Sequence, residues 1–133
     1  MSDFTIKPFE TFKIDQYIDS RGNLAAIDDS IFPNNFQFKR LFWIHNVPSA
    51  EKRGNHGHFE SNQILISLTD LVTCVYKRNN SNSISVNLMP GHGIFLPKLT
   101  WVSLEFANER SVLLVLTDNY YSSEDVFTSF GEL

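Results

Sequence analysis

Two histidines separated by one residue, His56 and His58, are the side chains whose type and spacing best suit chemistry. They lead into the apolar run of residues 63–68, which has the character of a strand. Because residues i and i+2 of a strand share a face, we expect both imidazoles to point into one pocket. A free imidazole, with a pKa of about 6.5, accepts or donates a proton near neutral pH. The pair therefore predicts proton transfer within that pocket.

The neighbours of the pair argue against the alternative that both histidines lie in a surface loop without a role. Gly57 between them and Gly54 before them allow close approach of the backbone. Arg53 supplies a permanent cation three positions before His56. The charged stretch of residues 47–55 is a loop of the kind that often carries function. Together these neighbours favour a functional site over a surface loop without a role.

The H-x-H spacing resembles the first metal-binding motif of the cupins, but the other ligands of the cupin site are missing. The third cupin ligand, a Glu, would stand four or five residues after His58, where this chain has Asn62 and Gln63. A second motif would add a His five residues after Pro97, where Val102 stands. Iron, manganese or zinc needs three or four converging nitrogen and oxygen donors. We therefore predict a site with no metal and no cofactor.

Short runs of β-branched and aromatic residues between turn residues predict that an all-β fold builds the pocket. The expected strands are residues 24–27, 36–45, 63–68, 71–77, 83–88, 93–96, 101–106 and 111–117. Eight strands suit a cupin-type double-stranded β-helix, or jelly roll, whose mouth commonly binds small ligands. One short helix is expected at residues 122–130, where Ser122 or Ser123 can cap a first turn that contains Glu124 and Asp125.

The composition limits the class of protein and its partners. With 42% apolar and 14% aromatic residues, the chain predicts one folded domain over residues 1–133. A net charge of −4 with scattered Lys and Arg argues against a nucleic-acid partner. Cys74, the only cysteine, lies in an apolar run and is expected in the core. No apolar stretch could span a bilayer and no signal peptide is recognisable, which predicts a cytoplasmic protein without a membrane partner.

Several segments, in the same order along the chain, resemble the WxcM-like family, which contains the dTDP-4-keto-6-deoxyglucose 3,4-ketoisomerases. The similarity extends from Phe12 over nearly the whole chain and is carried by residues 19–28, 39–44, 53–58, Gln63, 93–97, Trp101, 113–118 and 120–121. The resemblance implies a dimeric jelly roll that binds a dTDP-linked keto-deoxysugar, whose protons His56 and His58 would move. Jelly rolls also have exposed sheet edges, which an N-terminal strand from a second copy can cover in a homodimer.

The resemblance further implies which residues hold the substrate. Arg21, Arg40 and Arg53 are candidates for contact with the pyrophosphate or the sugar, because guanidinium groups suit phosphate oxygens. Gln63 is placed in the substrate site with them. Trp101 is a candidate for stacking on the thymine or the sugar ring, although a tryptophan in a strand is more often part of a core or a dimer interface.

The chain departs from the family at positions that bear on the reaction. Phe42 and Phe95 stand where the family usually has Tyr, so two hydroxyl groups are missing. Three functions therefore stay open. The first is a 3,4-ketoisomerase that works through an enediol. The second is another nucleotide-sugar enzyme of this fold, such as an epimerase, and the third is a weakly active or inactive binding domain. Retention of both histidines argues against the third.

Overall fold

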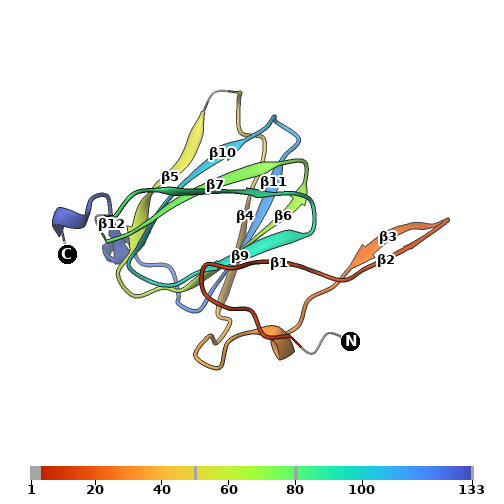
Figure 1. The fold of residues 1–133 in the computed structure, drawn as a ribbon, viewed down its shortest axis with the longest axis horizontal. Helices are drawn as coiled ribbons and strands as arrows, with labels where there is room; N and C mark the ends of the chain where they lie inside the picture. Colours follow the sequence, from red (N-terminus) through yellow and green to blue (C-terminus); the bar gives the residue numbers. More distant parts are fainter. Residues whose placement is uncertain (1–3, 50, 80, 133) are drawn as a thin grey trace.

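The computed structural model describes residues 4–49, 51–79 and 81–132, which form two five-stranded antiparallel sheets packed face to face (Figure 1). The first sheet contains, in spatial order, β1 (Thr11–Lys13), β9 (His92–Leu96), β6 (Gln63–Thr69), β11 (Val112–Thr117) and β4 (Arg40–Ile44). The second contains β12 (Val126–Phe127), β5 (Lys52–His58), β10 (Thr100–Phe106), β7 (Val72–Arg78) and β8 (Ile84–Leu88). The jelly roll predicted from the sequence is confirmed.

Two apolar layers hold this sandwich together. The layer between the sheets includes Leu65, Leu113 and Val115, and the layer on the outer face of the first sheet includes Ile64 and Ile66. The N-terminal residues and the segment after the β2–β3 hairpin cover that outer face, contributing Ile6, Ile14, Ile31 and Phe36. Strand β6 is therefore buried on both faces, which explains its unbroken apolar run in the sequence.

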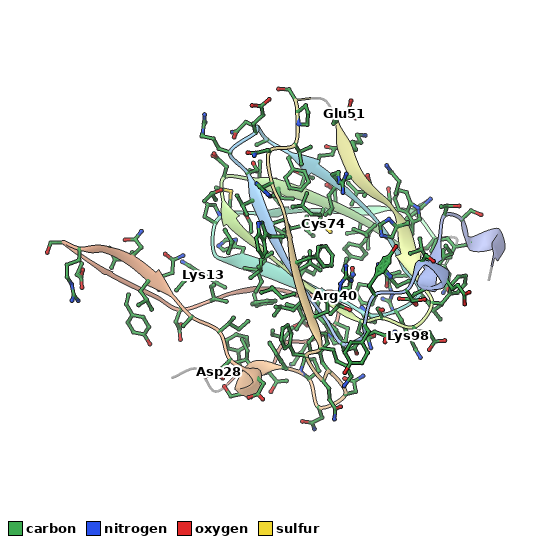
Figure 2. All side chains as sticks on the ribbon, turned by 180° about the vertical axis from the view of Figure 1, so that it is seen from behind. Lys13, Asp28, Arg40, Glu51, Cys74 and Lys98 are labelled. Atoms are coloured by element: carbon green, nitrogen blue, oxygen red, sulfur yellow. The ribbon has the colours of Figure 1, made fainter. Side chains whose placement is uncertain are left out.

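Cys74 lies between the two sheets, as expected (Figure 2). Its side chain is fully buried, and this burial raises the pKa of the thiol to about 12. A thiol with that pKa stays protonated at neutral pH and is a poor nucleophile. The cysteine therefore acts as a core residue.

A separate two-stranded hairpin, formed by β2 (Gln16–Asp19) and β3 (Gly22–Ala25), projects away from the sandwich (Figure 1). Its apolar side chains are largely in solvent: Tyr17 is 62%, Ile18 72% and Leu24 59% exposed. A two-stranded ribbon is marginally stable by itself in water. Of all parts of the fold, this hairpin is the one that the other described residues stabilise least.

The helix expected at residues 122–130 does not form. Ser122 caps a single 3-10 turn, Ser123–Asp125, by accepting a hydrogen bond from the Glu124 N–H. The chain then extends into β12, which pairs with the edge of β5 and buries Phe127 completely. Burial of an aromatic side chain outweighs the weak local preference for a helix. No helix in the described part of the chain is long and apolar enough to cross a bilayer.

Candidate functional site

A β-bulge in β5 places Arg53 and His56 on the same face of this strand. Arg53 pairs with Leu104 of β10 and His56 pairs with Val102, so Asn55 is an extra residue in the ladder. Gly54 and Asn55 both have positive φ angles, of 89° and 57°. A spacing of three would put Arg53 and His56 on opposite faces of a regular strand. The extra residue restores the same face, and both side chains point between the sheets.

Glycines make this local geometry possible. A Cβ atom at Gly54 would lie 2.9 Å from the carbonyl oxygen of Val102, and one at Gly57 would lie 2.3 Å from the ring of Phe127. The backbone of β5 therefore approaches its neighbours more closely than other residue types allow. Gly57 faces outward, so the residues on either side of it, His56 and His58, both face inward.

The two imidazoles lie together, as the sequence predicted, with ring centroids 5.1 Å apart and planes at 81°. His56 Nδ1 is 2.8 Å from the carbonyl oxygen of Gly54. His58 Nδ1 is 3.1 Å from Asp125 Oδ2. Both partners accept hydrogen bonds, so each Nδ1 carries the proton in the neutral ring. The lone pair of each imidazole is then on Nε2, which is the nitrogen available to a ligand.

Asp125, which the sequence analysis placed in the first turn of a helix, is instead a buried carboxylate beside His58. It also accepts hydrogen bonds from the Glu60 N–H, at 2.6 Å, and from the Ser61 hydroxyl. Its backbone carbonyl accepts a hydrogen bond from the Phe59 N–H. Sequence periodicity could not have found this contact, because 67 residues separate Asp125 from His58.

The surroundings of His58 favour its neutral form. Burial lowers the pKa of His58 below its ordinary value of 6.5, the neighbouring His56 lowers it further, and Asp125 opposes both effects. His58 is therefore neutral at pH 7, and its contact with Asp125 is a hydrogen bond to a carboxylate rather than an ion pair.

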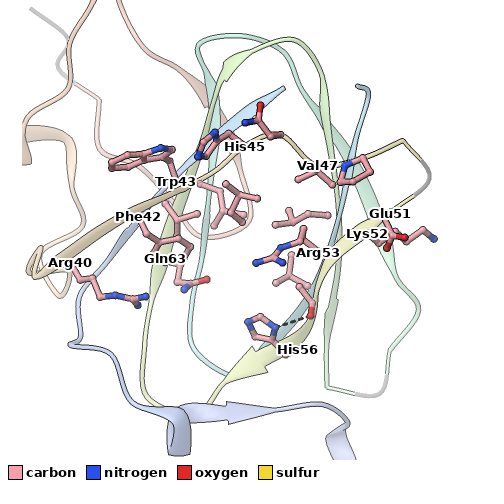
Figure 3. A pocket seen from close by; sticks show the side chains of 18 residues that line it. Arg40, Phe42, Trp43, His45, Val47, Glu51, Lys52, Arg53, His56 and Gln63 are labelled. Atoms are coloured by element: carbon pink, nitrogen blue, oxygen red, sulfur yellow. Dashed lines mark hydrogen bonds between the residues drawn. The ribbon is translucent and has the colours of Figure 1, made fainter. Parts of the chain in front are cut away.

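Two adjacent cavities between the sheets share the lining residues Arg40, Phe42, Arg53, His56 and Gln63. The larger, of about 680 Å³, extends toward residues 43–48 and 51–52. The smaller, of about 360 Å³ and called here the histidine lobe, also contains His58, Tyr121 and Asp125. Figure 3 shows Arg40 and Gln63 reaching into this space from the first sheet, opposite Arg53 and His56 from the second.

The structure thus brings together five of the seven residues that the sequence analysis proposed for the site: Arg40, Arg53, His56, His58 and Gln63. The Arg40 guanidinium lies over two aromatic rings, 4.6 Å from the centroid of Phe42 and 5.4 Å from that of Tyr121. Three other cavity residues, His45, Tyr121 and Ser61, were given no role from sequence. The sequence spacing between these residues and the H-x-H pair gave no reason to expect them in the site.

The other two proposed residues lie elsewhere in the chain. Arg21 is at the turn of the β2–β3 hairpin, where it pairs with Asp19 at 2.7 Å. Trp101 pairs in register with Gly57 and Lys77, on the outer face of the second sheet, and the Lys77 ammonium is 4.9 Å from its ring centroid. Neither side chain lines the cavities. Within one copy of the chain, neither is positioned to contact a ligand there.

The two missing tyrosine hydroxyls have different consequences. Phe42 lines both cavities, so its missing hydroxyl is lost from the site itself. Phe95 is buried in the outer apolar layer, edge-on to Phe36 with centroids 6.0 Å apart. The absence of a hydroxyl at Phe95 therefore leaves the chemistry of the cavity unchanged.

The positions that would complete a cupin metal site hold Gln63 and Val102, and both side chains line the cavity with His56. An amide is a weak ligand for the divalent metals of such sites, and a valine side chain cannot be a ligand. Among residues 4–49, 51–79 and 81–132, no three His, Cys, Asp or Glu side chains are grouped closely enough to hold a metal ion.

Comparison with known proteins finds relatives over nearly the whole chain. A family model described as FdtA, WxcM-like, C-terminal, matches residues 7–132. A TDP-4-oxo-6-deoxy-α-D-glucose 3,4-oxoisomerase of Aneurinibacillus thermoaerophilus is 27% identical over 114 residues, which cover 85% of this chain and 81% of the relative.

Solved structures with this fold extend the comparison. The QdtA 3,4-ketoisomerase of Thermoanaerobacterium thermosaccharolyticum, as a double mutant in complex with TDP, superposes with a TM-score of 0.84. It is 28% identical, and the match covers 96% of this chain and 92% of QdtA. The epimerase RmlC of Legionella pneumophila has a TM-score of 0.75 at 16% identity, over 88% of this chain and 70% of RmlC. That second likeness shows a common fold only.

Proposed function

The chain belongs to the WxcM-like, C-terminal family, and from this premise we propose that it is a 3,4-ketoisomerase of a dTDP-linked 4-keto-6-deoxyhexose. The proposal treats residues 1–133 as one functional domain. It places the enzyme in the cytoplasm. The observation that carries the proposal is the pair of imidazoles in the histidine lobe, each with Nδ1 bonded and Nε2 available.

The reaction requires two proton transfers at neighbouring carbons. A base removes the proton from C3, and the electron pair moves to form a C3–C4 double bond while the C4 carbonyl oxygen gains a proton. The enediol then loses its proton from the C3 hydroxyl, and a proton is delivered to C4. The product is the 3-keto isomer, with no net change in oxidation state. One or two neutral imidazoles on one face of the sugar can perform these transfers.

The two arginines of the cavity support binding of an anionic substrate. Arg40 and Arg53 reach the shared space from opposite sheets, and both are available at its lining (Figure 3). Guanidinium groups form paired hydrogen bonds with phosphate oxygens. We assign them to the pyrophosphate and Gln63 to the sugar. The relative from Aneurinibacillus thermoaerophilus is named for a reaction on a TDP-linked oxo sugar, and that name supports the same substrate class here.

We also propose that the enzyme is a homodimer, and that the β2–β3 hairpin makes contact with the second copy. The exposed Tyr17, Ile18 and Leu24 provide an apolar surface for this contact. Arg21 lies at the tip of the same hairpin, so it can reach a substrate only in the cavity of another copy. Trp101, on an outer face, is assigned to no ligand contact within its own chain.

The deciding experiment follows deuterium during turnover. In deuterated buffer, the protein should convert dTDP-4-keto-6-deoxyglucose to the 3-keto isomer, and NMR should show loss of the C3 proton and deuterium at C4. Loss of the C3 proton without the 3-keto product would support an epimerase. Binding without any exchange would identify a binding domain and would exclude both enzymes.

The proposed reaction uses no metal. Purified protein should contain no stoichiometric transition metal and should keep its activity in a chelator. Elemental analysis that finds one metal ion per chain, bound through His56 and His58, would contradict this part of the proposal. The assignment rests on Gln63 and Val102, which occupy the positions of the remaining cupin ligands.

A further inference from the structure

The two cavity histidines differ in the partner that holds Nδ1. The partner of His56 is a neutral backbone carbonyl, that of Gly54, two residues away in the same strand. The partner of His58 is a carboxylate, that of Asp125, which comes from the far end of the chain. A carbonyl and a carboxylate both fix the tautomer, but only the carboxylate also stabilises a positive charge on the ring. The two imidazoles are therefore not equivalent.

Asp125 is itself held firmly. Its side chain is buried, and its two carboxylate oxygens accept hydrogen bonds from the Glu60 N–H and the Ser61 hydroxyl as well as from His58. The 3-10 turn Ser123–Asp125 leads directly into β12, which pairs Val126 with His58 itself. The imidazole is thus carried by β5 and the carboxylate by the turn that leads into the paired strand β12, so the strand pairing keeps the two groups close.

We propose that Asp125 is the positioning residue of His58: it keeps Nδ1 protonated, leaves Nε2 free for the substrate, and stabilises the imidazolium that forms when Nε2 takes a proton. The kinetic part of this inference rests on the proposed isomerase function. The tautomer and the charge stabilisation do not, because they are properties of the unliganded protein.

A purely structural role for Asp125 makes different predictions, and the chain offers a matched control. Asp118 is a second carboxylate in the same C-terminal segment, and it binds the backbone N–H and the side-chain amide of Asn62 at 2.8 and 2.7 Å. It fastens the segment to the sandwich as Asp125 does, but it contacts neither cavity histidine. A structural effect should appear in both Asp→Asn variants, and a positioning effect only at Asp125.

The test compares Asp125→Asn with Asp118→Asn in protein labelled with ¹⁵N in histidine. In the wild type, the neutral ring of His58 should carry its proton on Nδ1. In Asp125→Asn, the amide can donate to Nδ1, so we expect a shift toward the Nε2–H form and a titration midpoint for His58 at lower pH. Asp118→Asn should leave both quantities as in the wild type, and Asp125→Glu, which keeps the charge, should retain the Nδ1–H form.

The kinetic readout is a fall in kcat on the order of 10²- to 10⁴-fold in Asp125→Asn, with little change in KM. A wild-type His58 that carries its proton on Nε2 would overturn the inference without any variant. It would also be overturned if Asp125→Asn left the tautomer and midpoint unchanged and lowered kcat only as much as Asp118→Asn. If the NMR results hold but the wild type does not isomerise the sugar, the proposed function fails and the positioning role stands.

Discussion

The histidine lobe and the β2–β3 hairpin differ in how much of their structure a single chain supplies. In the lobe, each catalytic candidate has a named partner: His56 bonds to the carbonyl of Gly54, and His58 bonds to Asp125. In the hairpin, the strands pair only with each other, and the one ion pair described there is local, between Asp19 and Arg21. Both histidines of the lobe are held by partners from their own chain, whereas the hairpin exposes apolar side chains and an arginine.

This contrast separates two kinds of substitution. A change in the lobe should alter the chemistry without altering association, because its contacts lie within one chain. A change in the exposed apolar residues of the hairpin should alter association first and activity only as a consequence. The comparison would fail if lobe variants dissociated the protein, or if substitutions of the apolar hairpin residues lowered activity in a protein that stayed associated.

The largest effect is expected from the histidines. His56→Asn or His58→Asn removes a proposed proton-transfer group, so turnover should fall on the order of 10²- to 10⁴-fold. Substrate affinity, measured by calorimetry, should change far less, because the proposed contacts to the pyrophosphate come from Arg40 and Arg53. The size of the particle in sedimentation should be that of the wild type. Two variants that turn over at the wild-type rate would exclude the proposed reaction.

Arg53→Ala should affect binding more than the histidine variants do, weakening substrate affinity at least as much as turnover. A hydrogen bond to a charged group contributes about 1.5–3 kcal/mol, so the dissociation constant should rise roughly 10- to 100-fold. Arg110→Ala serves as a matched control, since Arg110 is exposed and pairs with Asp70 away from the cavities. Equal losses of affinity in both variants would show that net charge, rather than the cavity, binds the substrate.

The hairpin is tested by Ile18→Asp, which places a charge on its most exposed apolar residue. Burial of such a side chain contributes about 1.5–3 kcal/mol, and a homodimer loses it in both copies, so the dimer dissociation constant should rise roughly 100-fold or more in sedimentation. Ile84→Asp, on the edge strand β8, is the control for an exposed isoleucine elsewhere. A monomeric wild type at micromolar concentration would contradict the homodimer directly.

Mixing variants tests whether Arg21 acts in the cavity of a second copy. Arg21→Ala and His56→Asn dimers should each be impaired. After subunit exchange in equal amounts, half of the dimers are mixed, and each mixed dimer contains one site with both residues intact. Activity should therefore recover to about a quarter of the wild type. No recovery, despite exchange confirmed by mass, would place Arg21 outside the partner's site.

The smallest effect concerns stability against pH. The pKa of His58 in the folded protein lies below its ordinary value of 6.5, so on acidification the unfolded chain binds this proton first. The stabilisation is complete above about pH 6.5 and is lost as the pH falls through the folded-state pKa. The melting temperature should decline over that window, and His58→Gln should flatten the decline. An equal decline of the melting temperature in the variant would show that groups other than His58 cause it.

The sequence predicted the strands that bury apolar residues on a face, but not the strands that pair for other reasons. Runs such as residues 63–68 and 111–117 lie close to β6 and β11 because apolar composition specifies them. Strand β5 has no apolar face and contains two glycines, so no periodicity marked it as a strand. Its place in the sheet comes from pairing with β10 and β12, a tertiary property.

The candidate site was predictable in part for the same reason. The H-x-H pair was recognisable by its local spacing, and the arginines by the family resemblance. Five of the seven proposed residues line one cavity. Asp125 had no local spacing that linked it to His58, because only the pairing of β12 with β5 brings the two residues together. The positions of Arg21 and Trp101 depend on the hairpin turn and on strand alternation, which the residue types alone do not specify.

The bulge in β5 also changes what an alignment of this segment can reveal. Arg53 and His56 are three positions apart in the sequence. Whether this spacing puts their side chains on the same face of β5 depends on whether the ladder skips one residue between them. A homologue that deleted Asn55 and straightened the strand would keep the guanidinium and the imidazole on one face, although an alignment would show a gap. A homologue that kept every letter of Arg-x-x-His but replaced Gly54 with a residue unsuited to a φ of 89° would turn the guanidinium outward. A deletion in this segment can leave both side chains on one face, whereas a single substitution at Gly54 can turn one of them to the opposite face of the strand.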